Sequence, residues 1–230
     1  MIEFLEVTKS YLGMRPILES VSLKIDKGEF FYLTGVSGAG KTTIFKLLML
    51  LEHADSGQIL VDDADVERFN AKRTALHRRR IGMIFQDYRL LPKLSIEENT
   101  ALPLRVAGYR GKALRQKTEA CLARVGMAER RKELVKSLSG GEQQLVAISR
   151  ATVFDPPVIL ADEPTGNLDQ NTAYTVMKSL REINQRGATV IVATHDLNLI
   201  RSFRARTLLI KERRIHEVRL VKPEREEMRA

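Results

Sequence analysis

The hydrophobic positions of this chain follow two periods, which predict strands and helices in alternation. Apolar and polar residues alternate over Ile2–Val7 and Val21–Ile25, as in strands with one buried face. Ile81–Phe85, Val158–Ala161 and Thr189–Thr194 are instead uniformly apolar, which is typical of strands buried on both faces of a parallel sheet. Two further apolar stretches, Phe30–Leu33 and Gly57–Val61, are also expected to be strands.

Helical periodicity appears between these strands. Apolar residues recur at helical spacing over Thr42–Leu51, Gly141–Phe154 and Thr172–Arg186. Strands that alternate with helices predict an α/β domain that binds its ligand at the carboxyl ends of the strands.

The middle of the chain has a different pattern. Residues 87–138 contain no convincing strand. Ser95 and Glu98 form the pattern of a capping box that opens a helix over Ile96–Val106, and Lys112–Val125 is a second helix after the break at Gly108–Gly111. We expect a helical subdomain inserted into the α/β core.

A glycine-rich segment follows the apolar stretch Phe30–Leu33. It has the pattern Gly-x-x-x-x-Gly-Lys-Thr and opens a helix, which is the expected context of a phosphate-binding loop. Backbone N–H groups and the helix dipole can hold phosphate oxygens, Lys41 can neutralise the β- and γ-phosphates, and Thr42 can offer a hydroxyl to Mg²⁺. The residues of this loop are Gly35, Val36, Ser37, Gly38, Ala39, Gly40, Lys41, Thr42 and Thr43. The segment predicts binding of a nucleoside triphosphate.

Two carboxylates end the apolar run Val158–Ala161. Asp162 suits coordination of Mg²⁺ beside Thr42, and Glu163 suits polarising a water that attacks the γ-phosphate. A phosphate loop alone does not distinguish a kinase, a GTPase, a helicase and a transport ATPase. The pair of carboxylates narrows the choice among these classes.

The sequence LSGGEQQ at Leu138–Gln144 is a second distinctive motif. Ser139 and Glu142 form the pattern of a capping box, and Gly140 and Gly141 leave backbone N–H groups open to an anion at a helix start. The order of GVSGAGKTT, Gln86, LSGGEQQ, LADEP, Gly166–Asp169 and His195 resembles the nucleotide-binding domain of ABC-type ATPases over nearly the whole chain.

This resemblance implies a fold and an assembly. The implied fold is α/β: a P-loop NTPase core with a parallel sheet, an N-terminal antiparallel β-subdomain and an inserted helical subdomain. The core would span residues 1–86 and 156–220, the helical subdomain about 87–155, and a charged tail 221–230. In the family, two copies sandwich two ATP molecules head to tail, so this chain is expected to form a homodimer when ATP is bound.

Site roles also follow from the resemblance. Ser139, Gly140, Gly141 and Glu142 would meet the γ-phosphate of the ATP held by the other copy. Gln86 would sense Mg²⁺ and the attacking water, Gly166–Asp169 would line the dimer seam, and His195 would contact the γ-phosphate. Tyr11 would stack on adenine. The implied reaction is Mg²⁺-dependent hydrolysis of ATP, with Glu163, His195 and Gln86 as catalytic residues and Thr42, Gln86 and Asp162 near the metal.

Within the family, the phrases IGMIFQDYRLLP (Ile81–Pro92), LADEPTGNLD and ATHDLNLI (Ala193–Ile200) resemble the cell-division ATPases most. That group implies pairing with an integral membrane protein and control of cell-wall hydrolysis. The lipoprotein-release and macrolide-export ATPases share LSGGEQQ and PTGNLD and remain the alternative. Signalling by ATP-driven closure with little hydrolysis also remains open, because the same residues would serve it.

Two positions depart from the family pattern. Leu145 replaces an arginine of the signature helix, which we expect to change a subdomain contact. The family usually has a glycine in the last turn, but Lys211–Arg214 has none, so Leu208–Ile210 and Ile215–Val218 are expected to form a loose hairpin.

Composition limits the remaining possibilities. The chain carries 38 lysines and arginines against 29 acidic residues, a net charge of +9 that suits a nucleotide, a nucleic acid or an anionic membrane. A soluble nucleic-acid ATPase is disfavoured because such relatives carry two ATPase domains or a long coiled coil, so no nucleic acid is expected as a partner. Apolar runs are short of the roughly 18 residues of a membrane span. No export signal is expected, so we place the chain peripherally at the cytoplasmic face of the plasma membrane. Cys121, the single cysteine, is expected to be a buried apolar residue.

Overall fold

The computed structural model describes residues 1–13 and 15–218, so the predicted charged tail at 221–230 lies outside the described residues. The strands are β1 (Ile2–Lys9), β2 (Leu18–Ile25), β3 (Phe30–Thr34), β4 (Ser56–Val61), β5 (Ala64–Asp65), β6 (Ile81–Ile84), β7 (Val158–Asp162), β8 (Thr189–Ala193), β9 (Arg206–Lys211) and β10 (Arg214–Val218). The helices are α1 (Lys41–Leu48), α2 (Ala71–Arg79), α3 (Ile96–Val106), α4 (Gly111–Arg124), α5 (Gly140–Thr152), α6 (Gln170–Gln185) and α7 (Leu197–Ser202). Val66–Arg68 and Val135–Ser137 are short 3₁₀ helices.

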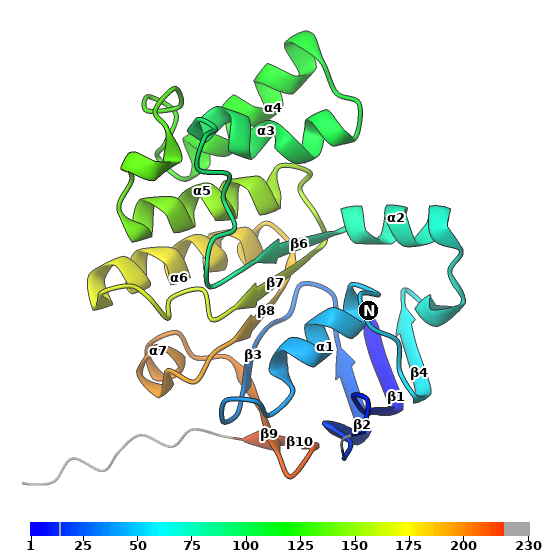
Figure 1. The fold of residues 1–230 in the computed structure, drawn as a ribbon. Helices are drawn as coiled ribbons and strands as arrows, with labels where there is room; N and C mark the ends of the chain where they lie inside the picture. The colour runs from blue at the N-terminus through cyan, green and yellow to red at the C-terminus, as the bar shows by residue number, and fades with distance from the viewer. Residues whose placement is uncertain (14, 219–230) are drawn as a thin grey trace, which may run out of the picture.

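A six-stranded sheet forms the centre of the molecule (Figure 1), in the order β10-β9-β3-β8-β7-β6. All its neighbouring strands are parallel except the β9–β10 hairpin. Both faces are buried: Phe31 and Leu33 of β3 enter one core, whereas Phe30 and Tyr32 enter the other. This two-sided burial explains why the central strands are uniformly apolar.

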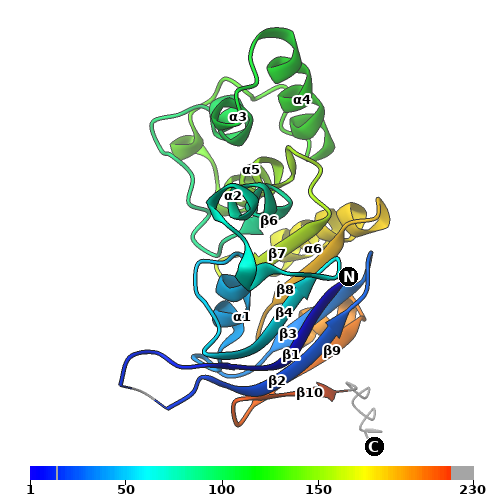
Figure 2. The same ribbon diagram turned by 90° about the vertical axis from the view of Figure 1, so that its right-hand side faces the viewer.

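A second, antiparallel sheet covers one side of the central sheet, in the order β2-β1-β4-β5. Its inner residues share one hydrophobic core with α1 and the central strands (Figure 2). In β2, Val21, Leu23 and Ile25 are buried, and Ser22 and Lys24 between them are exposed. The alternation in the sequence therefore marked the correct inner face.

Helices cover the other side of the central sheet. Residues of α5, α6 and α7 pack on it, while α3 and α4 lie beyond α5 (Figure 1). Residues 87–138, all of them described, form α3, α4, one 3₁₀ turn and an isolated bridge between Ser95 and Leu134 in place of any strand. The Ser95–Glu98 capping box is present, and Cys121 of α4 is buried as expected. Leu145 of α5 packs against the cores on both sides of that helix.

Two local expectations were wrong. The last hairpin is tight: Lys211 pairs with Arg214, and Glu212 and Arg213 between them take left-handed φ angles of 51° and 66°. These angles belong to a two-residue turn that normally favours glycine or asparagine, and here the pairing of β9 with β10 imposes it. Helix α1 ends at Leu48 rather than Leu51, because Leu50 turns left-handed at φ 54° and the N–H of Leu51 donates to the carbonyl of Lys46.

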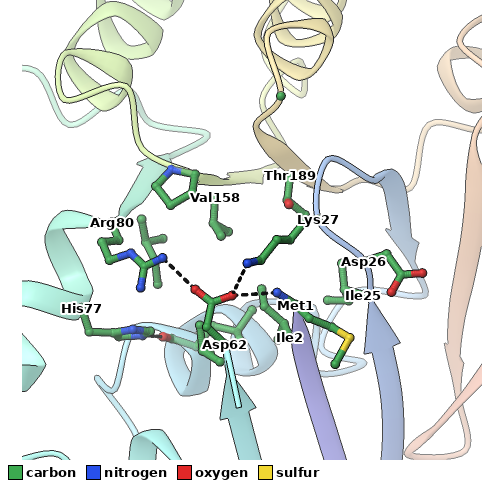
Figure 3. A pocket seen from close by; sticks show the side chains of 15 residues that line it. Met1, Ile2, Ile25, Asp26, Lys27, Asp62, His77, Arg80, Val158 and Thr189 are labelled. Atoms are coloured by element: carbon green, nitrogen blue, oxygen red, sulfur yellow. Dashed lines mark hydrogen bonds and ion pairs between the residues drawn. The ribbon is translucent and has the colours of Figure 1, made fainter. Parts of the chain in front are cut away.

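A small cavity of about 170 Å³ lies at the amino ends of β7 and β8, between the two sheets (Figure 3). Asp62 lies at its edge and accepts hydrogen bonds from the Met1 amino group at 2.9 Å and from Arg80 at 2.7 Å, with Lys27 Nζ at 3.1 Å. These cationic donors hold the pKa of Asp62 well below its usual range. The cluster ties β1, the β2–β3 turn and the end of α2 to the edge of β4.

Candidate active site

A cleft of about 1070 Å³ opens at the carboxyl ends of β3, β6, β7 and β8. Loops that follow parallel strands meet at this edge of the sheet, which is where α/β proteins bind ligands. Most of the predicted site residues line the cleft: Tyr11, Val36, Ser37, Gly38, Ala39, Gly40, Lys41, Thr42, Thr43, Gln86, Asp162, Glu163 and His195. The central sheet therefore brings together segments that are up to 184 positions apart, from Tyr11 to His195.

The loop between β3 and α1 is shaped by its glycines. Gly35 has φ 152°, and a β-carbon there would lie 2.8 Å from the carbonyl oxygen of Ile210, so only glycine permits this approach. Gly40 caps α1 at φ 109° without a side-chain hydrogen bond, which leaves the first-turn N–H groups of the helix available to an anion. The Lys41 ammonium is nearly buried and donates to the carbonyls of Gly35 at 2.8 Å and Val36 at 3.3 Å.

Thr42 and Asp162 form the oxygen-rich part of the cleft. The Thr42 hydroxyl donates to Asp162 Oδ2 at 2.9 Å. Burial raises the pKa of Asp162, so a cation beside this carboxylate would be favourable. A hydroxyl and a carboxylate are ligands that Mg²⁺ accepts. The described residues contain no group of three or more His, Cys, Asp or Glu that could hold a metal by themselves, so further ligands would have to be amide, water or phosphate oxygens.

Glu163 lies between a cation and an imidazole. Its Oε1 atom is 2.9 Å from Nδ1 of His195 and 3.7 Å from Nζ of Lys41. The residue takes a left-handed φ of 45°, and its N–H donates to the carbonyl of Ala193 at the end of β8. Such a conformation costs roughly 1–3 kcal/mol in a residue other than glycine and is frequent at active sites. Its carboxylate can accept a proton from a water at the mouth of the cleft.

Gln86 and the predicted Gly166–Asp169 loop are neighbours. Gln86 is exposed after β6, and the Asn167 amide donates to its carbonyl at 3.4 Å. A β-carbon on Gly166 would lie 2.9 Å from Gln86 Nε2, so glycine allows the two loops to touch. Asp169 caps α6 by accepting from the N–H groups of Asn171 and Thr172.

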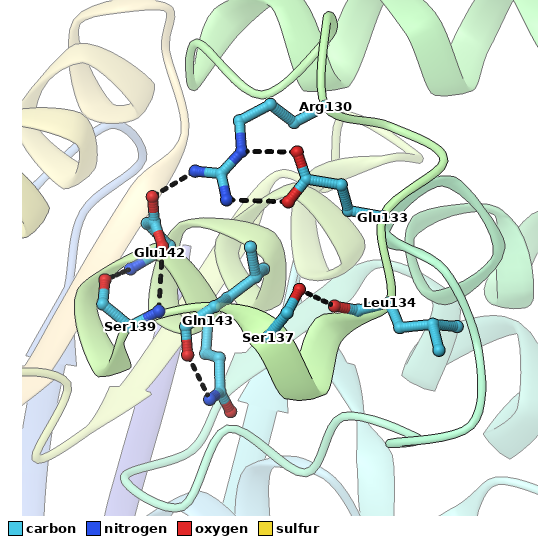
Figure 4. A network of polar contacts seen from close by, with 8 residues as sticks. Arg130, Glu133, Leu134, Ser137, Ser139, Glu142 and Gln143 are labelled. Atoms are coloured by element: carbon cyan, nitrogen blue, oxygen red, sulfur yellow. Dashed lines mark hydrogen bonds and ion pairs between the residues drawn. The ribbon is translucent and has the colours of Figure 1, made fainter.

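The Ser139–Glu142 segment does not line the cleft of its own chain. It forms the first turn of α5, where Ser139 Oγ accepts from the Glu142 N–H, and the Glu142 carboxylate accepts from the Ser139 N–H and from Arg130 (Figure 4). These donors lower the pKa of Glu142, the Ser139 N–H more than Arg130. Gly141 also has a packing role, because a β-carbon there would lie 2.0 Å from Cγ2 of Thr172.

Tyr11 lines the cleft beside the last residue of the phosphate loop. Its hydroxyl is 3.3 Å from Thr43 Oγ1, and its ring centroid is 5.4 Å from Lys9 Nζ and 5.6 Å from Lys46 Nζ. Sequence reasoning missed Ile17, Lys46 and Arg89, which also line the cleft. Lys46 lies three residues after Thr43, and Arg89 lies three residues after Gln86, and this spacing was the available signal.

Comparison with known proteins identifies the family. The sequence model of the family described as "ABC transporter" matches residues 18–166. The chain belongs to this family. It is 45% identical to the cell division ATP-binding protein FtsE of Escherichia coli K12 over 90% of this chain and 95% of that protein. It is 42% identical to FtsE of Bacillus subtilis, over 92% and 93%.

Solved structures agree with this membership. A dimeric structure of the ATP-binding cassette MJ0796, in a post-hydrolysis state bound to ADP and Pi, superposes with a TM-score of 0.83 at 34% identity. It covers 96% of this chain and 100% of that chain. CbiO1 of Clostridium perfringens, part of the cbiONQ transporter complex, gives a TM-score of 0.87 at 27% identity, over 94% and 86%. The predicted fold class, the ATPase class and the resemblance to the cell-division group are confirmed. Within residues 1–13 and 15–218, no helix has the length and apolarity to cross a membrane.

Proposed function

We propose that this chain is the ATP-hydrolysing subunit of a membrane complex that acts in cell division. It would bind peripherally, at the cytoplasmic face of the plasma membrane, to an FtsX-like integral membrane protein and control cell-wall hydrolysis. The similarity to FtsE proteins over nine-tenths of the chain supports the cellular role. The chemical role is supported by the cleft itself.

The observation that carries the proposal is the shared position of Lys41, Glu163 and His195. One carboxylate oxygen of Glu163 lies within 3.7 Å of the Lys41 ammonium and 2.9 Å of the His195 ring. This arrangement offers a positive charge for phosphate, a base for water and a polar group at the same point. Lys41 would neutralise the β- and γ-phosphates, Glu163 would accept the proton of the attacking water, and His195 would orient Glu163 and touch the γ-phosphate.

Thr42, Asp162 and Gln86 are the residues that would hold Mg²⁺. When bound, this ion would supply positive charge that neutralises the phosphate oxygens. The loop from Gly35 to Thr43 would cradle the phosphates, and Tyr11 would stack on the adenine ring.

The cleft of one chain lacks some of the ATP contacts that the proposal requires, namely those from the Ser139–Glu142 segment. Ser139, Gly140, Gly141 and Glu142 lie outside the cleft of their own chain, so they would contact ATP only across a dimer. The dimeric structures of the MJ0796 cassette support a dimer of this kind. ATP would then close the dimer and hydrolysis would reopen it, and this motion would be passed to the membrane partner.

The test uses purified full-length chain and its co-expressed FtsX-like partner. We expect Mg²⁺-dependent release of phosphate from ATP, and co-purification of the two proteins from membranes. Lys41→Ala should abolish ATP binding, whereas Lys178→Ala, at an exposed lysine on α6, should leave it unchanged. A folded wild-type chain that binds no ATP would refute the chemical role. Capture by a lipoprotein-release or macrolide-export membrane protein in place of the FtsX-like one would refute the cellular role.

A further inference from the structure

Arg89 is a cation of the cleft that lies within the phrase Ile81–Pro92 but has no predicted role. It lies in the loop after β6, and its guanidinium carbon is 3.9 Å from the centroid of the Phe85 ring. Its Nε atom is 3.2 Å from Asp87 Oδ1. Phe85, Asp87 and Arg89 all line the cleft. The ring and the carboxylate orient the guanidinium, and because this ion pair is exposed, a more highly charged anion can displace Asp87.

Arg89 lies at the end of the cleft where hydrolysis would occur. Arg89 follows β6, which pairs in parallel with β7, and the end of β7 carries Asp162 and Glu163, so all three residues line the same part of the cleft. Glu163 contacts His195, which follows β8, the strand on the other side of β7. A phosphate group close to Asp162 and Glu163 would be the terminal one.

The turn that carries Arg89 has an unfavourable backbone conformation and is held by hydrogen bonds from helix α5. Tyr88 and Arg89 take left-handed φ angles of 58° and 48°, which side chains other than glycine rarely adopt. Arg150 of α5 donates to both of their carbonyls, at 2.7 Å for Tyr88 and 2.5 Å for Arg89. Two charge-assisted hydrogen bonds can offset the cost of this conformation.

In the part of the chain that the structure describes, the Arg150 guanidinium donates hydrogen bonds to these two carbonyls only. Among residues 1–13 and 15–218 it has no carboxylate partner, and burial lowers the pKa of its guanidinium. The same turn also touches the start of α5, because a β-carbon on Gly140 would lie 2.9 Å from the Tyr88 hydroxyl. The turn is thus in contact with the helix whose first residues would meet the second ATP.

We propose that Arg89 is a second cationic ligand of the terminal phosphate of ATP, and that Arg150 is the positioning residue that presents it. The inference rests on the proposed ATPase function and names a further specificity residue for it. Lys41 alone would attract di- and triphosphates through the β-phosphate, whereas Arg89 would favour the nucleotide that carries a third phosphate. Movement of α5 would shift Arg89 together with the Ser139–Glu142 turn.

The first test is nucleotide affinity, measured by calorimetry with Mg²⁺ and either AMP-PNP or ADP. Arg89→Gln should weaken AMP-PNP binding roughly tenfold, the value of one charge-assisted hydrogen bond, and ADP binding less than about threefold. The matched control is Arg73→Gln, because Arg73 of α2 is also exposed and stacked on a phenylalanine, 4.4 Å from the Phe69 centroid, but does not line the cleft. Equal losses for both nucleotides, or no loss, would overturn the role of Arg89.

The second test separates positioning from simple structural support. Arg150→Lys keeps the charge but replaces two guanidinium nitrogens, each bonded to one carbonyl, by a single ammonium nitrogen. It should hold the turn less firmly and therefore reduce the preference for AMP-PNP over ADP as Arg89→Gln does. The double variant should lose no more than Arg89→Gln alone. A parallel fall for both nucleotides, or additive effects, would refute the positioning role. If wild-type chain binds neither nucleotide, the proposed function has failed; if it binds and hydrolyses ATP but Arg89→Gln matches Arg73→Gln, only this inference has failed.

Discussion

His195 and Glu163 are joined by a contact of 2.9 Å between Nδ1 of the imidazole and Oε1 of the carboxylate. His195 follows β8 and Glu163 follows β7, and these strands are neighbours in the central sheet. Adjacent parallel strands therefore place a base and a polar ring side by side at the edge where the phosphate loop also ends. The side chain of Glu163 is 14% exposed, so a water can reach it.

Replacing Glu163 should separate ATP binding from ATP hydrolysis. Glu163→Gln keeps the size of the side chain but removes the base, so we expect the hydrolysis rate to fall by about 10²-fold or more. ATP should still bind, and light scattering should detect an accumulated dimer. Glu129→Gln, at an exposed glutamate before α5, is the control and should retain the wild-type rate. Undiminished turnover in Glu163→Gln would mean that another group is the base.

Gly141 should tolerate a side chain only if α6 yields space. A β-carbon at this position would overlap Cγ2 of Thr172 at 2.0 Å. We expect Gly141→Ala to lower the free energy of unfolding by about 1–3 kcal/mol, as overpacking does. Thr172→Ser removes the overlapping methyl group, so the double variant should recover most of this loss in urea unfolding. Additive losses in the double variant would show that this contact is not the cause.

Arg130 should matter for dimer closure rather than for ATP binding by one chain. Its guanidinium contacts both Glu142 and Glu133, so it partly neutralises a carboxylate beside the proposed phosphate-binding turn (Figure 4). In Arg130→Gln, the unneutralised Glu142 would repel the incoming triphosphate. We expect ATP-dependent dimerisation in a Glu163→Gln background to weaken roughly tenfold with monomer affinity unchanged. Arg131→Gln, the neighbouring arginine paired with Glu97, should leave dimerisation as it is.

Asp62 should make stability depend on pH in a defined direction. Its folded-state pKa is lowered by the Met1 amino group, Arg80 and Lys27, so it stabilises the fold above the unfolded pKa of about 4. This contribution is lost as the pH falls below about 4, toward the lower folded value. Asp62→Asn should therefore cost about 1 kcal/mol near pH 7 and progressively less as the pH falls below about 4, measured by urea unfolding. Asp26→Asn, at another residue lining this cavity, is the control; a pH-independent difference for Asp62→Asn would contradict the assignment.

Some of this protein could be predicted from its residues because the determining interactions are local. The phosphate loop is a contiguous pattern, and capping boxes at Ser95 and Ser139 depend on residues three positions apart. Uniform or alternating apolar strands show directly whether one face or two are buried. The carboxylates were found because they follow such a strand, whereas the role of His195 came from the resemblance to the family.

Other features depended on the order of strands and on packing, which no local period encodes. The approach of Glu163 to Lys41 and His195 requires β3, β8 and β7 to be neighbours, and residues more than 120 positions apart then share one cleft. Packing of α5 on α6 gives Gly141 its second role, and pairing of β9 with β10 forces Glu212 and Arg213 into a tight turn. The contacts of Arg150 with Tyr88 and Arg89 span 62 and 61 positions between a helix and a loop. The periodicity of apolar residues identified the buried faces of the strands and helices, and the motifs identified the chemical groups of the site. Tertiary packing decided which of these groups meet, because the distances between them are set by long-range contacts between elements.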